Sequence, residues 1–248
     1  MTKRKFGLTS AGLHIFAMIF MLMDHMWATV LSDYQWLNMV GRLAFPIFAF
    51  MIVEGYTHTR NLKKYVLRLL LFAIVTEIPF NLMVGSRIFY YPHQNVLWTF
   101  LIAIGLIYLN ELAAKKDNIW LSFITGVSTM VIGYALGYIA FVDYYGEGVL
   151  TVLVFYFLRE RKWWCYLGQL IGMYYIHVEM IKGLYFEVEL FGIEFKVIQQ
   201  GLAILSLVFI WLYNGERGNK SKVFQYFCYA FYPAHMLILW LIMVLMNR

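Results

Sequence analysis

Charged side chains are scarce in this sequence. Only 14% of its 248 residues are Asp, Glu, Lys or Arg, whereas 62% are hydrophobic. A soluble domain carries about 25% charged and about 45–50% apolar residues. The composition excludes a separate soluble domain. It predicts an all-α, multi-pass protein of the cell membrane whose residues 1–248 form a single integral membrane domain in contact with lipid.

Other features are also rare or missing. The two cysteines, Cys165 and Cys228, lie in or beside predicted helices and indicate no disulfide framework. No H-E-x-x-H motif or Cys/His cluster occurs, so no metal is predicted. No A-x-A-like site ends the first apolar run, which we expect to remain as a helix. The net charge of +6 comes from basic residues scattered in short loops. Positive-inside topology explains that pattern better than nucleic-acid binding does.

Nine apolar segments predict a helical bundle of about nine spans. The sixth is too short to cross alone, so we expect it to be tilted, re-entrant or buried among the others. Lys and Arg gather before the first span and after the even-numbered spans, which predicts a cytoplasmic N-terminus and an outer C-terminus. The expected spans are 11–31, 38–57, 66–84, 95–112, 119–141, 147–158, 164–186, 198–213 and 223–246.

Ionisable side chains inside these spans are the strongest indication of function. They are costly in hydrocarbon and usually face a cavity, a partner or a reaction. The topology predicts one set toward the outer face, namely Asp24, His25, Arg42, Glu77 and Asn81.

Within this outer set, His25 is the candidate general base or nucleophile because histidine titrates near neutral pH. Asp24 points about 100° away from His25, so it is poorly placed to orient that ring. A salt bridge between Asp24 and Arg42 is the alternative interpretation of those two charges. Glu77, from another span, is the better candidate partner for His25.

A second set is predicted toward the cytoplasm. Glycine, backbone amides and arginine in LYNGERG suit an anionic ligand. Simpler interpretations remain open: His58 as an interfacial side chain, Arg217 as a topology signal, and His235 as a helix–helix hydrogen bond. The candidate ligand-binding residues are Glu54, His58, Arg60, Asn214, Arg217 and, inside the last span, His235.

Several sequence blocks resemble the TraX family. They are MLMDHMW, the stretch GRLAFPIFAFMIVEGYTHTRNLKKYVLRLLLFAIVTEIPFNL, NVLWTF, LYNGERG and FCYAFYPAHMLIL. The TraX family is associated with acetylating the N-terminus of conjugative pilin. The chain is also similar, more loosely, to multi-span acyltransferases that modify surface sugars with acyl groups from cytoplasmic acyl-CoA. Those enzymes place a histidine in the first span and an arginine nearby, to which His25 and Arg42 would correspond.

The resemblance and the two polar sets together predict an acyltransferase. Acetyl-CoA would be the acyl donor, bound near Arg60, Asn214 and Arg217, with its pantetheine arm passing His235 and Glu54. The acceptor, a glycan, peptide or small molecule, would enter from outside. The rival class is a proton-coupled transporter or flippase that uses the same groups as a relay. A structural or assembly protein is the third interpretation.

Overall fold

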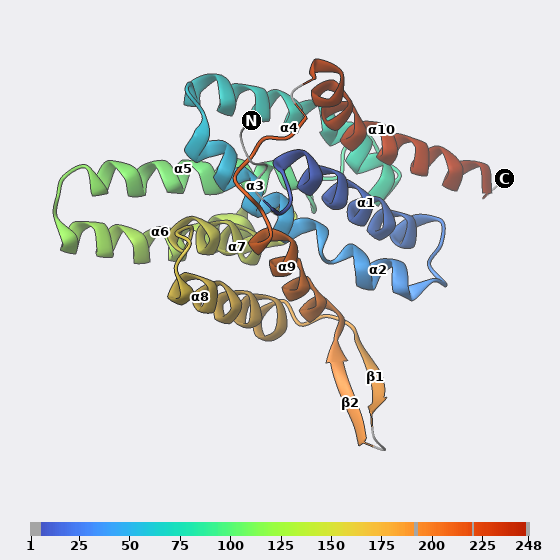
Figure 1. The fold of residues 1–248 in the computed structure, drawn as a ribbon. Helices are drawn as coiled ribbons and strands as arrows, with labels where there is room; N and C mark the ends of the chain where they lie inside the picture. The colour runs from blue at the N-terminus through green and yellow to red at the C-terminus, as the bar shows by residue number, and fades with distance from the viewer. Residues whose placement is uncertain (1–5, 191–192, 220, 247–248) are drawn as a thin grey trace. The chain divides into compact units, whose positions relative to one another are not determined.

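The computed structural model describes residues 6–190, 193–219 and 221–246 (Figure 1). The chain forms two compact units. One contains the residues up to Met51 and from Met173 onward, and the other contains Ile52–Gly172. The helices are α1 (Ser10–Thr29), α2 (Gln35–Gly41), α3 (Ala44–His58), α4 (Leu62–Gly85), α5 (Val96–Ala114), α6 (Ile119–Ile139), α7 (Tyr145–Phe157), α8 (Trp163–Tyr174), the π-helix η1 (Tyr175–Met180), the 3₁₀ helix η2 (Gln199–Leu205), α9 (Ser206–Trp211) and α10 (Lys222–Met246).

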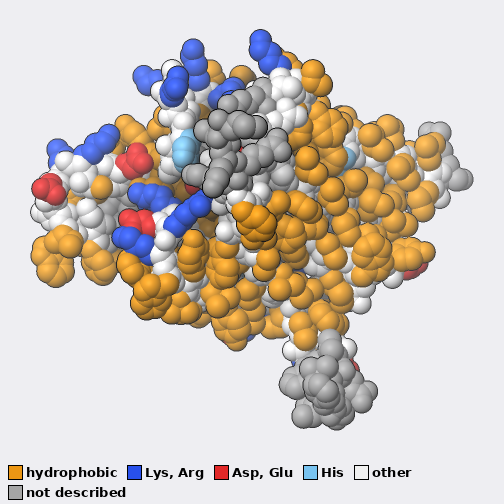
Figure 2. Space-filling view, in the orientation of Figure 1, with side chains coloured by type: hydrophobic (Ala, Val, Ile, Leu, Met, Phe, Trp, Pro, Cys, Tyr) orange, Lys and Arg blue, Asp and Glu red, His pale blue; other side chains and the backbone are white. Residues whose placement is uncertain are grey.

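Six helical segments in the described part of the chain are long and apolar enough to cross a membrane. They are α1, the pair α2–α3, α4, α5, α6 and α10. The apolar segments α7 and η2–α9 are shorter. Apolar side chains cover most of the visible helical surface, and Lys and Arg occur in small groups (Figure 2). A membrane protein is therefore supported, while the count of nine spans is not confirmed. The cytoplasmic N-terminus and the single membrane domain stay predictions.

A β-hairpin departs from the all-α prediction. Strands β1 (Tyr185–Leu190) and β2 (Ile193–Ile198) pair antiparallel, with Tyr185 opposite Ile198. The predicted seventh span extended to residue 186, but its helix ends at Met180. The sequence FEVEL followed by IEFKV alternates apolar and polar residues, which is the period of a strand rather than of a helix.

In the first unit, α1 packs against α2 and against α10. The second predicted span is broken between Gly41 and Ala44. Pro46 explains this break, because it has no N–H to bond the carbonyl of Arg42 four residues earlier and its ring clashes there. Arg42 consequently lies at the end of α2 instead of inside a continuous helix.

In the second unit, α7 is the central helix. It packs against α5 and α6, and every residue from Gly146 to Tyr156 is buried. Glycines permit this close packing: a Cβ on Gly133 would lie 2.8 Å from side-chain atoms of Leu106 and Val149. The short sixth span is therefore buried among the other helices, which is one of the three alternatives predicted for it.

Candidate functional site

Two histidines meet between α1 and α10. The Nδ1 atom of His25 lies 2.7 Å from Nε2 of His235, and the two ring planes are nearly parallel, at 10°, with centroids 4.9 Å apart. His25 is half-buried and His235 is only 5% exposed. The helix–helix hydrogen bond predicted as one interpretation of His235 is therefore present, and its partner is the candidate catalytic histidine.

An apolar groove reaches His235. It has a volume of about 420 Å³ and is lined by Leu22 of α1 and by side chains of α10 between Phe227 and Leu239. His235 contributes the polar ring to a lining that otherwise consists of Leu, Phe, Ala and Ile side chains. Apolar substrate atoms in this groove would therefore lie beside His235, the member of the pair that lines it.

The side chain of Asp24 lies on a different face of α1 from that of His25. Its carboxylate forms an ion pair with Arg42 and accepts a hydrogen bond from Asn38 Nδ2 at 2.7 Å. Asp24 can lie this close to α2 only because residue 41 is glycine. A Cβ on Gly41 would lie 2.5 Å from the Cβ of Asp24. The salt bridge between Asp24 and Arg42, one of the two interpretations of these charges, is thus confirmed, and Asp24 faces α2 while His25 faces α10.

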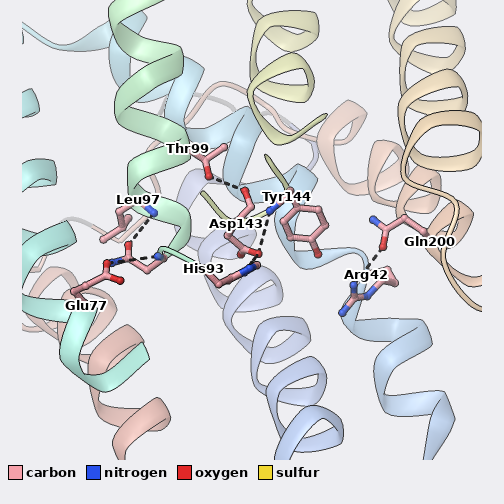
Figure 3. Close-up of polar contacts among 9 residues, drawn as sticks. Arg42, Glu77, His93, Leu97, Thr99, Asp143, Tyr144 and Gln200 are labelled. Carbon is pink, nitrogen blue, oxygen red and sulfur yellow. Dashed lines mark hydrogen bonds and ion pairs between the residues drawn. The ribbon is translucent and has the colours of Figure 1, made fainter. Parts of the chain in front are cut away.

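Buried amides extend the Asp24–Arg42 ion pair into a network. Arg42 donates to Gln200 Oε1 at 3.2 Å, as drawn in Figure 3, and Gln200 Nε2 lies 2.9 Å from His177 Nδ1. Gln199 donates to the side-chain oxygen of Asn38. These partners are buried, with exposed fractions of 6% or less. The network therefore holds the Arg42 guanidinium on both sides, through Asp24 and through Gln200.

Glu77 and Asn81 belong to the second unit and have their own partners there. Glu77 accepts hydrogen bonds from Asn95 and, at 2.9 Å, from Trp98 Nε1. Asn81 donates to the carbonyl oxygen of Ile88 at 3.0 Å. The contacts of Glu77 tie α4 to the start of α5, and the contact of Asn81 ties α4 to the connection that follows it. The expected role of Glu77 and Asn81 in orienting His25 or the acceptor stays a prediction.

His93 and Asp143 join two connections of the second unit. His93 Nε2 lies 3.1 Å from Asp143 Oδ1, and the same carboxylate oxygen accepts a hydrogen bond from the backbone N–H of Tyr144, as Figure 3 shows. Burial alone would lower the pKa of His93. The hydrogen bond and charge of Asp143, with the charge of Glu77, outweigh that effect and leave the His93 pKa raised above 6.5.

The LYNGERG segment binds the start of α1. The carbonyl oxygens of Glu216 and Arg217 accept the backbone N–H groups of Ser10 and Ala11 at 2.8 and 3.1 Å. The side-chain oxygen of Asn214 accepts the N–H of Glu216 at 2.8 Å. Asn214 thus shapes this loop, and two of the first amides of α1 are already bonded. The side chain of Arg217 is exposed and remains the group here that suits an anion.

Comparison with known proteins gives the family. A model described as TraX protein matches residues 10–243, a range that includes His25, Arg42 and His235. The chain belongs to the TraX family. A relative from Dichelobacter nodosus, the "Probable fimbrial assembly protein FimC, serogroup H1", is 27% identical over 253 residues, which cover 95% of this chain and 96% of that protein. No solved structure matches.

The remaining predicted ligand-binding residues of this TraX-family chain lie near the end of α3. His58 Nδ1 is 3.6 Å from a carboxylate oxygen of Glu54, one turn earlier, and the His58 side chain is 74% exposed. Arg60 follows the helix and is exposed. These positions suit ligand contact from solution, but their role in holding CoA stays a prediction.

Four members of the site were missed from the sequence: Asn38, His177, Gln199 and Gln200. Each is a polar side chain in or beside an expected span, which is the same signal that identified Asp24 and His25. Gln199 and Gln200 open the predicted eighth span as adjacent amides. Within the described residues, no group of three His, Cys, Asp or Glu side chains is arranged to hold a metal ion.

Proposed function

We propose that this TraX-family protein is a membrane-embedded acyltransferase. It would move an acetyl group from cytoplasmic acetyl-CoA to an acceptor reached from the outer face. The observation that carries this proposal is the His25–His235 pair, held between two apolar helices beside an apolar groove. Paired imidazoles at such a place suit proton transfer in a water-poor site.

The reaction needs one proton acceptor. An imidazole nitrogen of His25 would take the proton from the acceptor hydroxyl or amine as its O or N forms a bond to the thioester carbonyl carbon. The C–S bond then breaks, and the departing thiolate takes the proton from the imidazolium to become free CoA. In the alternative route, His25 attacks the thioester itself and carries the acyl group before passing it on.

The other predicted residues would bind the two substrates. Arg217 is exposed and would pair with a phosphate of CoA. Arg60 is also exposed, and its expected contact with CoA stays a prediction. Arg42, its guanidinium oriented by Asp24 and Gln200, would hold an anionic acceptor or stabilise the negative charge that develops on the carbonyl oxygen. Asn214, which bonds its own loop, would support the position of Arg217 rather than contact CoA.

The name of the Dichelobacter nodosus relative suggests which acceptor to test first. That protein is called a probable fimbrial assembly protein, so we propose a role in fimbrial or pilus assembly, with a fimbrial subunit polypeptide as the acceptor. A surface glycan or small molecule would use the same chemistry. Incubating membranes with radiolabelled acetyl-CoA, and identifying the labelled molecule, distinguishes these acceptors.

The His25→Ala variant tests the enzyme. General-base catalysis contributes about 10²–10⁴-fold, so transfer of label should fall by roughly that factor. The matched control is Ile19→Ala, an exposed change on the same helix, which should keep normal turnover. Size-exclusion chromatography in detergent establishes that both variants remain folded. Transfer at the wild-type rate by His25→Ala would remove His25 from the mechanism.

The buried network from Asp24 through Arg42 and Gln200 to His177 favours one rival, a proton-coupled transporter or flippase. Binding of acetyl-CoA to purified protein, measured by calorimetry, supports the enzyme. Substrate-dependent proton flux into proteoliposomes, together with no acetyl-CoA binding, supports the transporter.

A further inference from the structure

Three aromatic rings, those of Phe231, His235 and His25, are neighbours at the histidine pair. Phe231 lies one helical turn before His235, and their ring centroids are 4.8 Å apart at 18°. The rings of His25 and His235 are nearly parallel, with centroids 4.9 Å apart and an angle of 10° between their planes. His235 is therefore held between an aromatic ring of its own helix and the imidazole of α1.

The hydrogen bonds of His235 determine where its proton lies. Its Nδ1 atom is 2.7 Å from the carbonyl oxygen of Phe231. A carbonyl oxygen only accepts, so Nδ1 of His235 must carry the proton. Neutral His235 then presents an unprotonated Nε2, which acts as an acceptor.

The same logic extends to His25. Because Nε2 of His235 accepts, the atom 2.7 Å away, His25 Nδ1, must donate. His25 keeps this Nδ1 proton whether the ring is neutral or protonated. The nitrogen that gains and loses a proton is consequently Nε2 of His25.

We propose that His235 is a positioning residue that fixes His25 in the Nδ1–H tautomer and directs its basic Nε2 toward the reaction. This inference rests on the acyltransferase function proposed above. It replaces the expected contact of His235 with the pantetheine arm by an action through His25. In the reaction, the acceptor's proton moves to His25 Nε2 and from there to the departing thiolate, while both Nδ1 protons stay in place.

Two substitutions at one position separate this role from packing. In His235→Leu no side-chain atom can accept a hydrogen bond from the Nδ1–H of His25. The kcat with radiolabelled acetyl-CoA should therefore fall on the order of 10–100-fold, while the KM for acetyl-CoA is unchanged. His235→Gln offers an amide oxygen near the former Nε2 and should restore most of the turnover. Leu241→Ala, an exposed change on α10, is the control. Wild-type kcat in folded His235→Leu would overturn the proposal, and so would a folded His235→Gln as slow as His235→Leu.

A second measurement does not depend on activity. ¹⁵N NMR of the full chain with ring-labelled histidine distinguishes protonated from unprotonated ring nitrogens, and a His25→Gln sample assigns the His25 signals. Neutral His25 should be protonated at Nδ1 in the wild type and lose that preference in His235→Leu. Protonation at Nε2 in the wild type would overturn the positioning role. If the wild type transfers no acetyl group, the proposed function fails, and this measurement still decides the role of His235.

Discussion

Asp24 and Arg42 depend on each other because both are largely buried, with side chains only 17% and 19% exposed. Asp24→Asn would leave the Arg42 guanidinium without its carboxylate. We expect the free energy of unfolding to fall by about 3 kcal/mol, the lower end for breaking a buried pair, since both side chains keep some exposure. Chemical denaturation in detergent measures the loss.

The double variant Asp24→Leu with Arg42→Met should recover much of that stability, because apolar side chains can replace a buried ion pair. Asp33→Asn, an exposed carboxylate after α1, is the control and should change stability by about 0.5 kcal/mol or less. Strictly additive losses in the Asp24 and Arg42 variants would mean that the two charges do not interact.

The directions of Asp24 and His25 can be predicted from the sequence, but the distant partner of His25 cannot. Adjacent residues on a helix point about 100° apart, so the divergence of Asp24 from His25 follows from the sequence alone. The identity of the residue that contacts His25 does not follow from the sequence. Periodicity identifies the face of a helix, but not which distant helix covers that face, so the contact with His235 required the structure.

At the scale of elements, long apolar runs predict α1, α4, α5, α6 and α10 well. The errors have local causes. Pro46 divides the second expected span, and alternating polarity between residues 185 and 198 forms a hairpin where a helix end and a loop were expected. The eighth expected span begins as the 3₁₀ helix η2 before it continues as α9. A hydropathy average over a window of residues does not detect any of these local features.

The packing of α1 on α2 depends on Gly41. A Cβ there would lie 2.5 Å from the Cβ and 2.8 Å from the backbone Cα of Asp24, so the helices must move apart. We expect Gly41→Ala to destabilise the protein by about 1–3 kcal/mol, as overpacking does. Thermal unfolding measured by intrinsic fluorescence tests this expectation.

Gly105 offers a matched control for Gly41. It lies inside α5, and no other packed atom of the described chain lies within 4 Å of a Cβ built there. Gly105→Ala should be neutral or stabilising by up to about 1 kcal/mol, since alanine favours the helix. If both alanines had the same effect, close packing at Asp24 would not be the reason for glycine at position 41.

At the scale of the whole molecule, the polar groups divide between the two units. The first unit contains the histidine pair and the Arg42 network, and the second contains Glu77 and the His93–Asp143 contact. A chemical reaction is proposed only for the first. In the second, the bonds of His93 and Asp143 connect the segments that precede α5 and α7, so their expected effect is on stability.

That effect should depend on pH. The His93 pKa is raised in the folded chain, by its hydrogen bond to Asp143 and by the charges of Asp143 and Glu77, against the opposing effect of burial. A raised folded pKa means that protonated His93 stabilises the fold fully below about pH 6.5, and that this stability is lost as pH rises through the folded value. His93→Gln keeps a donor for Asp143 but does not titrate. The melting temperature of the wild type minus that of His93→Gln should therefore be largest below about pH 6.5 and decline at higher pH. A difference that stays constant from acidic to alkaline pH, or that grows as pH rises, would show that protonated His93 does not stabilise the fold.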